Sequence, residues 1–499
     1  MEINFQHRTE TIYQEFRVPD KWTQITIESV VPDVSEDIGR IVTVKPTVML
    51  KSKERSNTGL AVGGLLSLVL LYIGEESERL SCVRMQKEFQ LNYELDGLEE
   101  EQLAHIQLKL GNAEARVVNP RKVSVTVEVR GELSCFRQES LVTETSLPED
   151  CAGRLYVKGE HVEATVINAV CEKSFALNEQ YRFREGEPIP AELLAEGARL
   201  SVESMEQVGS RVVLKGRLWT EIWYLSDESS AVVKTEFNSP FSQIIDTGAE
   251  ECVNGTACLC LTNTYFDLID TISGDKALDV EIHAILQLVS RAEQGIDYLS
   301  DAYSNQMTTE CSSRNLAFTR IGAMQRSVFD VEQEINLGDD CREVLGVFPA
   351  LTQISLANSE LNAQMNLDLI CRGPDGTPNA ARRTAALRRT DLLPGTRLLD
   401  ARILRAETGQ ENGSAVCKLS IEIVFQLEQG YEISMLDAVH AEEETRAYQD
   451  APSLCLVHVG EEELWDLAKE YHSSIRGIEQ VNELEYPLSG RLLLIPRES

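Results

Sequence analysis

Strict alternation of apolar and polar residues recurs at three widely separated places in this chain. The runs are Lys122–Val129, Ala277–Ala284 and Val416–Ile423. A period of two is typical of a β-strand that has one face in a core and the other in water. The runs therefore restrict the body of the chain to antiparallel β-structure, and we expect a mainly β protein.

A second set of segments indicates that one unit is used three times. Gly64–Tyr72 and Gly216–Tyr224 align with glycine and tyrosine in register, while Gln364–Cys371 keeps the alternation without the tyrosine. The first segment contains the apolar run Leu65–Ile73, which is shorter than the ~20 residues of a transmembrane helix and is interpreted as a buried strand. The repeat of roughly 150 residues exceeds the roughly 20–50 residues of a solenoid unit, and so predicts tandem domains.

We predict three tandem antiparallel β domains followed by a small βααβ domain. The predicted boundaries are 1–143 for repeat 1, 160–293 for repeat 2, 315–439 for repeat 3 and 454–499 for the C-terminal domain. Polar stretches without a sustained strand pattern are interpreted as linkers, at 144–159, 294–314 and 440–453. Little helix is expected outside the C-terminal domain, with Glu192–Glu196 after Pro190 as one short candidate.

The C-terminal segment has a pattern of its own. Its acidic triplet, 461–463, stands where the positive end of a helix dipole favours carboxylates. Leu464, Leu467, Ala468 and Tyr471 then recur at the spacing of one helix face, which should pack on a core. The expected elements are, in order, a strand at Cys455–Val459, a helix at Glu462–Tyr471, a helix capped by Ser473 or Ser474, and a strand at Leu492–Ile495.

This series resembles the LysM module, a small βααβ fold. The resemblance rests on Leu456–Val459, Leu464–Tyr471, Asn482 and Gly490–Pro496, and it implies binding of N-acetylglucosamine polymers or of another protein. LysM modules usually carry Gly-Asp-Thr before the Leu-Trp pair, whereas this chain has three glutamates. Those carboxylates add desolvation cost against a neutral sugar, and the glycine that allows close backbone approach is lost.

The change favours a protein ligand over a glycan. An acidic patch beside a tryptophan suits a basic protein surface, because charge steers association and the ring anchors it. The expected partner-binding residues are Glu461, Glu462, Glu463, Leu464, Trp465, Asn482, Leu484 and Tyr486. In the alternative interpretation, Leu464 and Trp465 are core residues and the glutamates are a solvated helix start.

The overall charge limits the classes of partner. The formal net charge is −34 over 499 residues, which repels phosphate backbones and anionic lipids. We therefore expect protein partners with basic patches, no nucleic acid and no direct membrane insertion, and self-association through the β repeats stays open. The first residues lack a basic segment followed by an apolar core, so we expect a cytoplasmic location.

No motif indicates catalysis. The seven histidines are dispersed, and no nucleophile elbow, phosphate-binding loop or dinucleotide fingerprint is present. The twelve cysteines are expected to be free and mostly buried thiols, with Cys258 and Cys260 on the same face of a strand. Because no Cys-x-x-Cys or histidine at ligand spacing accompanies them, we expect no metal and no cofactor. With no catalytic motif we also expect no enzymatic activity, while a glycosidase with two carboxyls positioned in a cleft stays an open alternative.

Two arginine pairs stand out against the acidic background. They are Arg382-Arg383 and Arg388-Arg389. They either dock an acidic segment or supply the charges that keep an exposed edge strand from pairing with another chain. The sequence leaves both interpretations open.

The resemblance to known proteins extends to the body of the chain. Val31-Pro32-Asp33 with Asp37-Ile38 and Ile41, followed by the glycine-to-tyrosine strand, resembles a β-rich repeat of unknown function found in clostridial spore proteins, although Glu36 stands where that family has proline. Three such repeats closed by one LysM module resemble the SipL-type spore coat morphogenetic proteins.

That resemblance implies a non-enzymatic scaffold on the mother-cell side of the forespore surface. Its LysM-like domain would recruit the ATP-hydrolysing basement-layer protein of the spore coat. The alternative is a peptidoglycan-binding protein that uses the same module on N-acetylglucosamine polymers.

Overall fold

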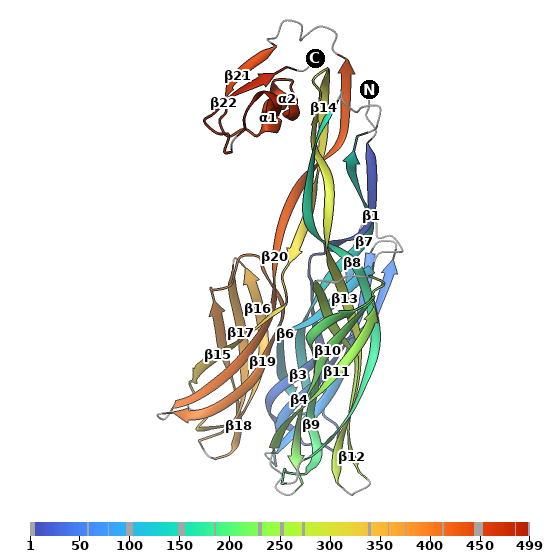
Figure 1. Ribbon diagram of the computed structural model, residues 1–499. Coiled ribbons are helices and arrows are strands. Elements are labelled where there is room, and N and C mark those ends of the chain that lie inside the picture. Colours follow the sequence, from blue (N-terminus) through green and yellow to red (C-terminus); the bar gives the residue numbers. More distant parts are fainter. Residues whose placement is uncertain are drawn as a thin grey trace.

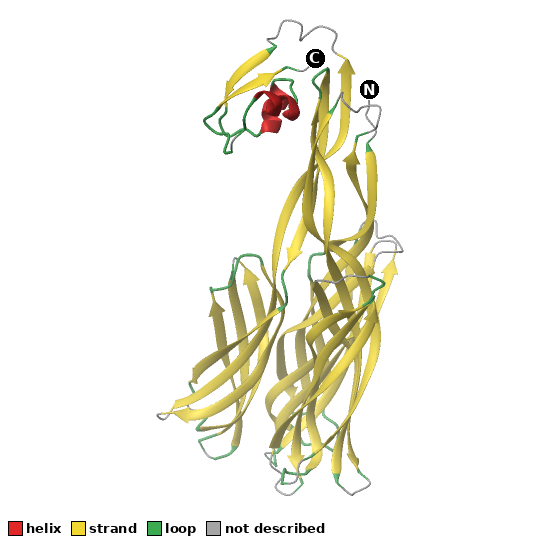
Figure 2. Ribbon diagram, in the orientation of Figure 1, coloured by secondary structure: helices red, strands yellow, loops and turns green. Residues whose placement is uncertain are grey.

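The computed structural model is almost entirely β-structure. It describes residues 5–56, 59–77, 79–95, 103–147, 155–183, 186–227, 232–249, 254–271, 275–337, 341–357, 359–374, 376–411, 414–443, 453–484 and 486–497. Within these ranges lie 22 strands and two short helices, and the strands form several antiparallel sheets. The expectation of a mainly β protein is confirmed, and both helices lie near the C-terminus (Figure 2).

Residues 5–147, here called unit 1, are organised around one long strand. The strands are β1 (Gln6–Arg17), β2 (Lys21–Val30), β3 (Ile38–Ser56), β4 (Gly59–Gly74), β5 (Leu80–Glu94), β6 (Leu103–Asn119) and β7 (Lys122–Ser146). Along one edge of β7, β2 pairs with its first half and β1 with its second half, while β6 pairs along the other edge. Strands β3, β4 and β5 form a separate meander.

The same pairing scheme recurs in residues 155–303, here called unit 2. Its strands are β8 (Tyr156–Arg182), β9 (Pro190–Val208), β10 (Arg211–Ser226), β11 (Val232–Asp246), β12 (Asn254–Asp270) and β13 (Lys276–Tyr303). The single strand β8 pairs with the full length of β13, in the place of β1 and β2, and β12 pairs with the other edge. Strands β9, β10 and β11 form the meander.

Residues 307–443, here called unit 3, repeat the scheme once more. The strands are β14 (Met307–Ile321), β15 (Gln325–Ile335), β16 (Glu343–Ala357), β17 (Glu360–Arg372), β18 (Pro378–Arg389), β19 (Thr396–Glu411) and β20 (Ser414–Glu443). Strands β14, β15 and β19 pair with β20, and β16, β17 and β18 form the meander.

In each unit the meander packs against the first half of the long strand and its neighbours. In unit 1, Val123, Val125 and Val127 face Leu66, Leu68 and Leu70. In unit 2, Leu278, Val280 and Ile282 face Leu214, Leu218 and Ile222. In unit 3, Cys417, Leu419 and Ile421 face Met365, Leu367 and Leu369. The alternating runs in the sequence are therefore the core-facing strands of three sandwiches, as their period indicates.

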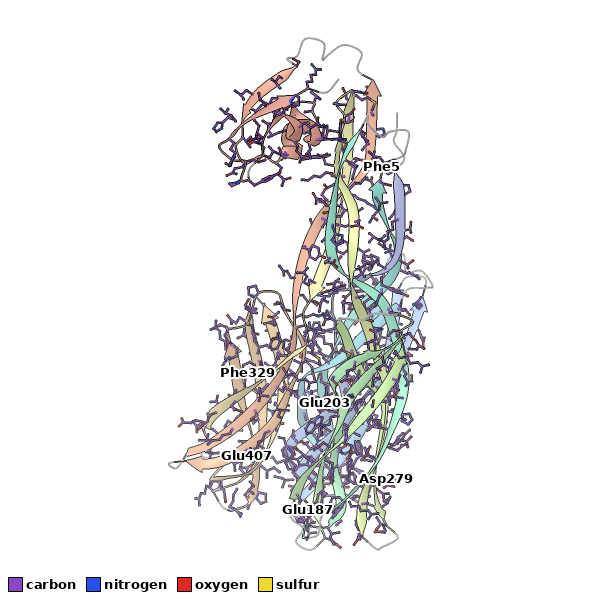
Figure 3. The ribbon with its side chains drawn as sticks, in the orientation of Figure 1. Phe5, Glu187, Glu203, Asp279, Phe329 and Glu407 are labelled. Carbon is purple, nitrogen blue, oxygen red and sulfur yellow. The ribbon has the colours of Figure 1, made fainter. Side chains whose placement is uncertain are left out.

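The second halves of the long strands form a narrow stalk. Each pairs with the first strand of its own unit, and the three ribbons run side by side away from the sandwiches (Figure 1). Residues from all three ribbons share buried clusters: Phe5, Leu299, Ala302, Leu436 and Val439 near the tip, and Leu141, Val166, Tyr298, Phe318 and Met435 further down. Phe5 is labelled at the upper end of the stalk in Figure 3.

Two sequence-based predictions are wrong, one in the stalk and one in the meander of unit 2. The stretch 294–314, interpreted as a linker, lies in β13 and β14 except for three residues between the strands. Glu192–Glu196, the helix candidate, lies in β9, where pairing with β10 and burial of Leu194 override helix propensity. The predicted linkers 144–159 and 440–453 fall partly outside the described residues, and their described parts include the ends of β7 and β20 and the start of β8.

The glycine and tyrosine that align between units 1 and 2 have matching roles. A Cβ on Gly64 would meet the ring of Phe89, and one on Gly216 would meet the ring of Phe241, because each glycine faces that phenylalanine across the strand pair. Eight residues on, Tyr72 and Tyr224 are fully buried and donate to backbone oxygens of Glu36 and Pro188, at 3.0 and 2.9 Å. The aligned segments β4 and β10 therefore pack alike.

A substitution at Gly216 can test this packing. In a Gly216→Ala variant the new methyl group would lie 2.5 Å from the Phe241 ring and 2.6 Å from the Ser201 carbonyl oxygen. We expect a loss of about 2–3 kcal/mol in equilibrium urea unfolding, since overpacking forces the backbone to shift. Gly430→Ala is the control, because Gly430 in β20 has nothing within 4 Å of its added Cβ. A neutral Gly216→Ala variant would contradict the packing described.

The arginine pairs lie on β18, whose described pairing is with β17 alone. Arg382 donates to Asp368, Arg388 to Glu360 and Arg389 to Asp391. Arg383 donates to the backbone oxygens of Asn336 and Leu337. The exposed side chains of Arg388 and Arg389 fit the edge-strand interpretation, whereas Arg382 also donates to the backbone oxygen of Ala113 in unit 1.

Residues 453–497, here called the tail, contain β21 (Leu454–His458), α1 (Leu464–Glu470), α2 (Ile475–Val481) and β22 (Leu492–Pro496). β21 pairs with β22, and the side chain of Ser474 caps α2 by accepting from the Gly477 N–H at 2.9 Å. Leu464, Leu467 and Ala468 are buried in the tail's core. The predicted order of elements is confirmed, with α1 starting two residues later than expected.

Candidate functional site

The tail is docked against the tip of the stalk through an aromatic side chain from β13. Tyr303 is 2% exposed and lies in the same buried cluster as the core of the tail. Its hydroxyl donates to the backbone oxygen of Ser473 at 2.9 Å, and its ring packs edge-on against Trp465, with centroids 4.9 Å apart. Tyr156 stacks on the other side of Tyr303. The stalk thus supplies part of the tail's hydrophobic core.

Charged groups surround this aromatic contact. Trp465 Nε1 donates to Asp301 Oδ2 at 2.8 Å, and Lys469 Nζ lies 2.7 Å from each oxygen of the same carboxylate. The register of β13 shifts between Leu299 and Asp301, and such a bulge changes the direction in which side chains project. Lys158 Nζ donates to Glu463 Oε2 at 2.9 Å. Asp301 therefore accepts hydrogen bonds from two residues of α1, Trp465 and Lys469.

The structure separates the predicted partner-binding residues into two groups. Leu464 and Trp465 are buried, at 9% and 7% exposure, which supports the alternative interpretation for both. Asn482 donates to the backbone oxygens of Ile478 and Leu494 and accepts from the Leu494 N–H, and Leu484 packs against the tail's core. These four residues hold the tail together or attach it to the stalk.

The remaining predicted residues reach solvent. Glu461, Glu462 and Glu463 are exposed, although Glu462 also accepts from the Gly460 N–H and Glu463 is paired with the stalk. Tyr486 is 71% exposed. The two loops that carry these residues are adjacent, because Val459 exchanges backbone hydrogen bonds with Gly490 and Arg491. The acidic turn and the tyrosine are therefore parts of one accessible end of the tail.

Removing the shared carboxylate should release the tail. In an Asp301→Ala variant Trp465 and Lys469 lose their partner, and charge-assisted hydrogen bonds of this kind are the stronger class. We expect at least tenfold faster deuterium exchange in peptides covering α1 and the end of β13. Asp297→Ala is the matched control, since Asp297 is exposed on the same strand and contacts His161. Equal exchange in the two variants would show that Asp301 does not hold the tail.

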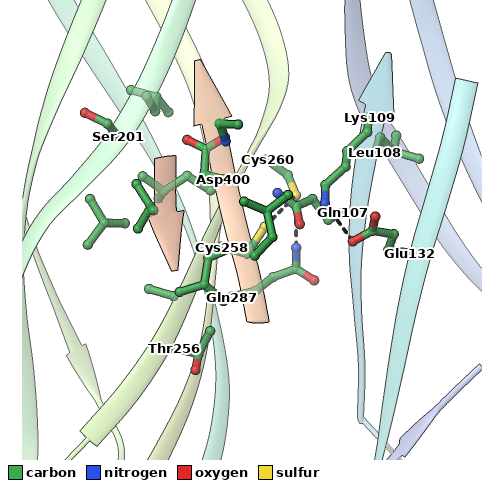
Figure 4. A pocket seen from close by; sticks show the side chains of 18 of the residues that line it. Gln107, Leu108, Lys109, Glu132, Ser201, Thr256, Cys258, Cys260, Gln287 and Asp400 are labelled. Atoms are coloured by element: carbon green, nitrogen blue, oxygen red, sulfur yellow. Dashed lines mark hydrogen bonds and ion pairs between the residues drawn. The ribbon is translucent and has the colours of Figure 1, made fainter. Parts of the chain in front are cut away.

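A second candidate site lies where the three sandwiches meet. A cavity of about 550 Å³ is lined by residues of β3, β6 and β7 from unit 1, β9, β12 and β13 from unit 2, and β16, β19 and β20 from unit 3. Figure 4 shows Cys258, Cys260, Gln287 and Lys109 around it. Its size is in the usual range for small-molecule pockets.

Ion pairs between the units surround this cavity. On one side, Arg291 of unit 2 lies 3.4 Å from Glu15 of unit 1, and Arg17 of unit 1 lies 3.0 Å from Glu428 of unit 3. On another, Arg199 of unit 2 lies 2.7 Å from Asp400 of unit 3. Burial lowers the pKa of both Arg199 and Arg291, although the guanidinium groups stay charged at any ordinary pH. The units therefore pack as one body rather than as separate beads.

The two neighbouring cysteines face the cavity as strand alternation predicts. Cys258 Sγ lies 3.9 Å from Cys260 Sγ, and Gln287 bridges Cys260 to the backbone of Ile106 in unit 1. Every cysteine in the described ranges is a free thiol, as predicted, but five of these ten are buried, four are intermediate and Cys311 is exposed. No cluster of three or more histidine, cysteine, aspartate or glutamate side chains suited to a metal ion occurs in the described part of the chain.

His105 of β6 is a buried histidine at the edge of this cavity. It is 8% exposed, packs edge-on against Phe136, and its Nε2 has no hydrogen-bond partner. Burial, with Lys53 nearby, lowers the pKa of His105 to about 3. The folded protein therefore holds this ring neutral, while the unfolded chain protonates it near its ordinary pKa of about 6.5.

This difference predicts a loss of stability in mild acid. Protons bind the unfolded state more readily between pH 6.5 and 3, so the free energy of unfolding falls as pH decreases through that range. From pH 6.5 to 5 the histidine should account for about 2 kcal/mol of that loss. A His105→Leu variant has a neutral side chain of similar size. Its free energy of unfolding, measured in urea, should fall by about 2 kcal/mol less than that of the wild type over the same pH interval. An unchanged pH dependence would contradict the assignment to His105.

Sequence reasoning identified the tail but missed its docking partner and the cavity. Asp301 and Tyr303 lay in the stretch interpreted as a linker, and no local pattern connects them to Trp465 more than 160 residues away. For the cavity, one available signal was the Cys258–Cys260 pair. Another was Arg291, a charged residue that follows the mainly apolar run 284–290.

Comparison of the chain with protein-family models, with curated proteins and with solved structures finds no match in any of the three. None of the helices in the described ranges has the length and apolar character needed to cross a membrane.

Proposed function

We propose that this protein is a non-enzymatic scaffold in spore coat assembly, of the SipL type. Its three tandem β domains correspond to units 1, 2 and 3, and its LysM-like domain corresponds to the tail. On this proposal the protein acts in the cytoplasm of the mother cell, at the forespore surface. The LysM-like domain recruits the ATP-hydrolysing basement-layer protein of the coat.

The main support for the proposal is the position of the tail, which is fixed at the tip of the stalk with one end exposed to solvent. Tyr303 and Asp301 fix the tail at the tip of the stalk, at the opposite end of the molecule from the sandwiches (Figure 1). The stalk is long, since the stalk half of β20 pairs with β14 over Glu428–Glu443, or about 50 Å at roughly 3.3 Å per residue. A rigid spacer with a docking group at its tip suits a protein that positions another protein.

The accessible end of the tail suits a basic protein surface. Glu461 and Glu462 supply exposed negative charge, and Tyr486 supplies an exposed aromatic ring on the adjacent loop. Charge at the rim steers association, while an aromatic side chain buried on binding contributes most of the affinity. Trp465 contributes by holding the tail in place, since its ring is already covered by the stalk.

The test uses exposed residues, because Leu464 and Trp465 are core residues whose loss would unfold the tail. A full-length Glu461→Lys/Tyr486→Ala variant should bind the purified basement-layer protein at least tenfold more weakly in surface plasmon resonance, with unchanged thermal stability. Glu479→Lys is the control, because it makes the same charge change at an exposed position of α2. Equal binding by the double variant and the control, or no binding by the wild type, would overturn the proposal.

The same proteins should be titrated with N-acetylglucosamine oligomers. The proposal expects no binding, since the acidic turn replaces the residues that would approach a neutral sugar. Oligomer binding that Tyr486→Ala abolishes would favour the peptidoglycan-binding alternative.

A further inference from the structure

The cavity between the three sandwiches differs in charge from the rest of the protein. The residues that line it include five basic side chains, Lys109, Arg199, Arg291, Arg326 and Arg397, and four acidic ones, Glu15, Glu132, Asp400 and Glu422. The whole chain has the opposite balance, with 47 lysines and arginines against 81 aspartates and glutamates. The lining therefore has one cation more than carboxylates, with Arg397 paired to Glu428 just outside it, whereas the whole protein is strongly acidic.

Two of the four carboxylates of the lining, Glu422 and Glu15, are each shared between two arginines. Glu422 lies 2.7 Å from Arg402 and 3.9 Å from Arg326. Glu15 lies 3.3 Å from Arg17 and 3.4 Å from Arg291. Arg291 has a side-chain exposure of 4%, so it is largely removed from solvent. Excess positive charge in a partly dry site attracts an anion, because few waters compete for the guanidinium groups.

The rest of the lining is mixed, with polar side chains such as Gln107, Thr256 and Gln353 beside apolar ones. Strands of different units contribute Val48, Leu108, Leu200, Ala257, Leu259, Leu351 and Ile354. Several of these side chains are half-buried against the sandwich cores, so a bound apolar group would complete their packing. The Asp400 side chain is 43% exposed and the Arg199 side chain 34%, which gives this side of the cavity access to solvent.

We propose that this cavity binds a small organic anion with an apolar body, of the chemical class of a medium-chain carboxylate. The anionic head accepts hydrogen bonds from the arginines, and the apolar body lies against the leucine and valine side chains. Because all three units line the cavity, an occupant bridges them and stabilises their packing. This inference is independent of what the tail binds.

The test is isothermal titration of the full-length protein with sodium decanoate below its micelle concentration. We expect one saturable site and a rise in melting temperature. Decyltrimethylammonium, which has the same chain and the opposite charge, should not bind at this site. No heat from decanoate, or equal affinity for the two amphiphiles, would overturn the proposal.

Two variants connect the binding to the cavity. Arg326→Gln removes a cation from the lining while Glu422 keeps Arg402, and it should weaken decanoate binding about tenfold. Arg211→Gln is the matched control, because Arg211 is exposed and pairs with Asp246 outside the cavity. Gln353→Trp, at an exposed position of the lining, should block entry without loss of thermal stability. Wild-type affinity in both Arg326→Gln and Gln353→Trp would place the bound anion elsewhere and refute the site.

Discussion

Each of the three long strands β7, β13 and β20 runs without a break from a sandwich into the stalk. Each is paired over its whole length, first inside a sandwich and then inside a stalk ribbon. A continuous hydrogen-bonded strand offers no hinge between these two environments. When the ribbons pack together through Phe5, Leu299 and Met435, the three sandwiches are brought against each other as a consequence.

The contacts between the sandwiches are partly apolar and partly ionic. Trp223 of unit 2 packs on Phe348 of unit 3, with ring centroids 4.0 Å apart, in a cluster completed by Leu71 and Ile73 of unit 1. Around the cavity, arginines and carboxylates from different units pair with each other. Several of the 47 lysines and arginines of this acidic protein lie between the units, around the cavity. The rest of the protein is correspondingly more negative than the cavity lining.

Local physics explains which predictions from the sequence succeeded. The strands of the sandwiches follow from strict alternation, since one face is buried in each. The elements of the tail follow from the Ser474 cap, the spacing of Leu464, Leu467 and Ala468, and the turn at Gly490. The stalk was mistaken for linkers because its apolar residues face two neighbouring ribbons, and so Tyr298, Leu299 and Ala302 do not alternate with a period of two. Trp465 could not be placed from the sequence, because burial depends on Tyr303 and Asp301 in a different part of the chain.

Local patterns of residues are sufficient to predict the mainly β composition, the recurrence of the glycine-to-tyrosine strand and the strand-helix-helix-strand order of the tail. Each of these depends on residues within one turn or one strand of each other. Three features became evident from the folded chain alone: the repeats share a stalk, Trp465 faces the protein's own β13, and five basic side chains line one cavity. The physical reason is that these features depend on pairing and burial between residues 100 or more positions apart, and no local pattern encodes such contacts.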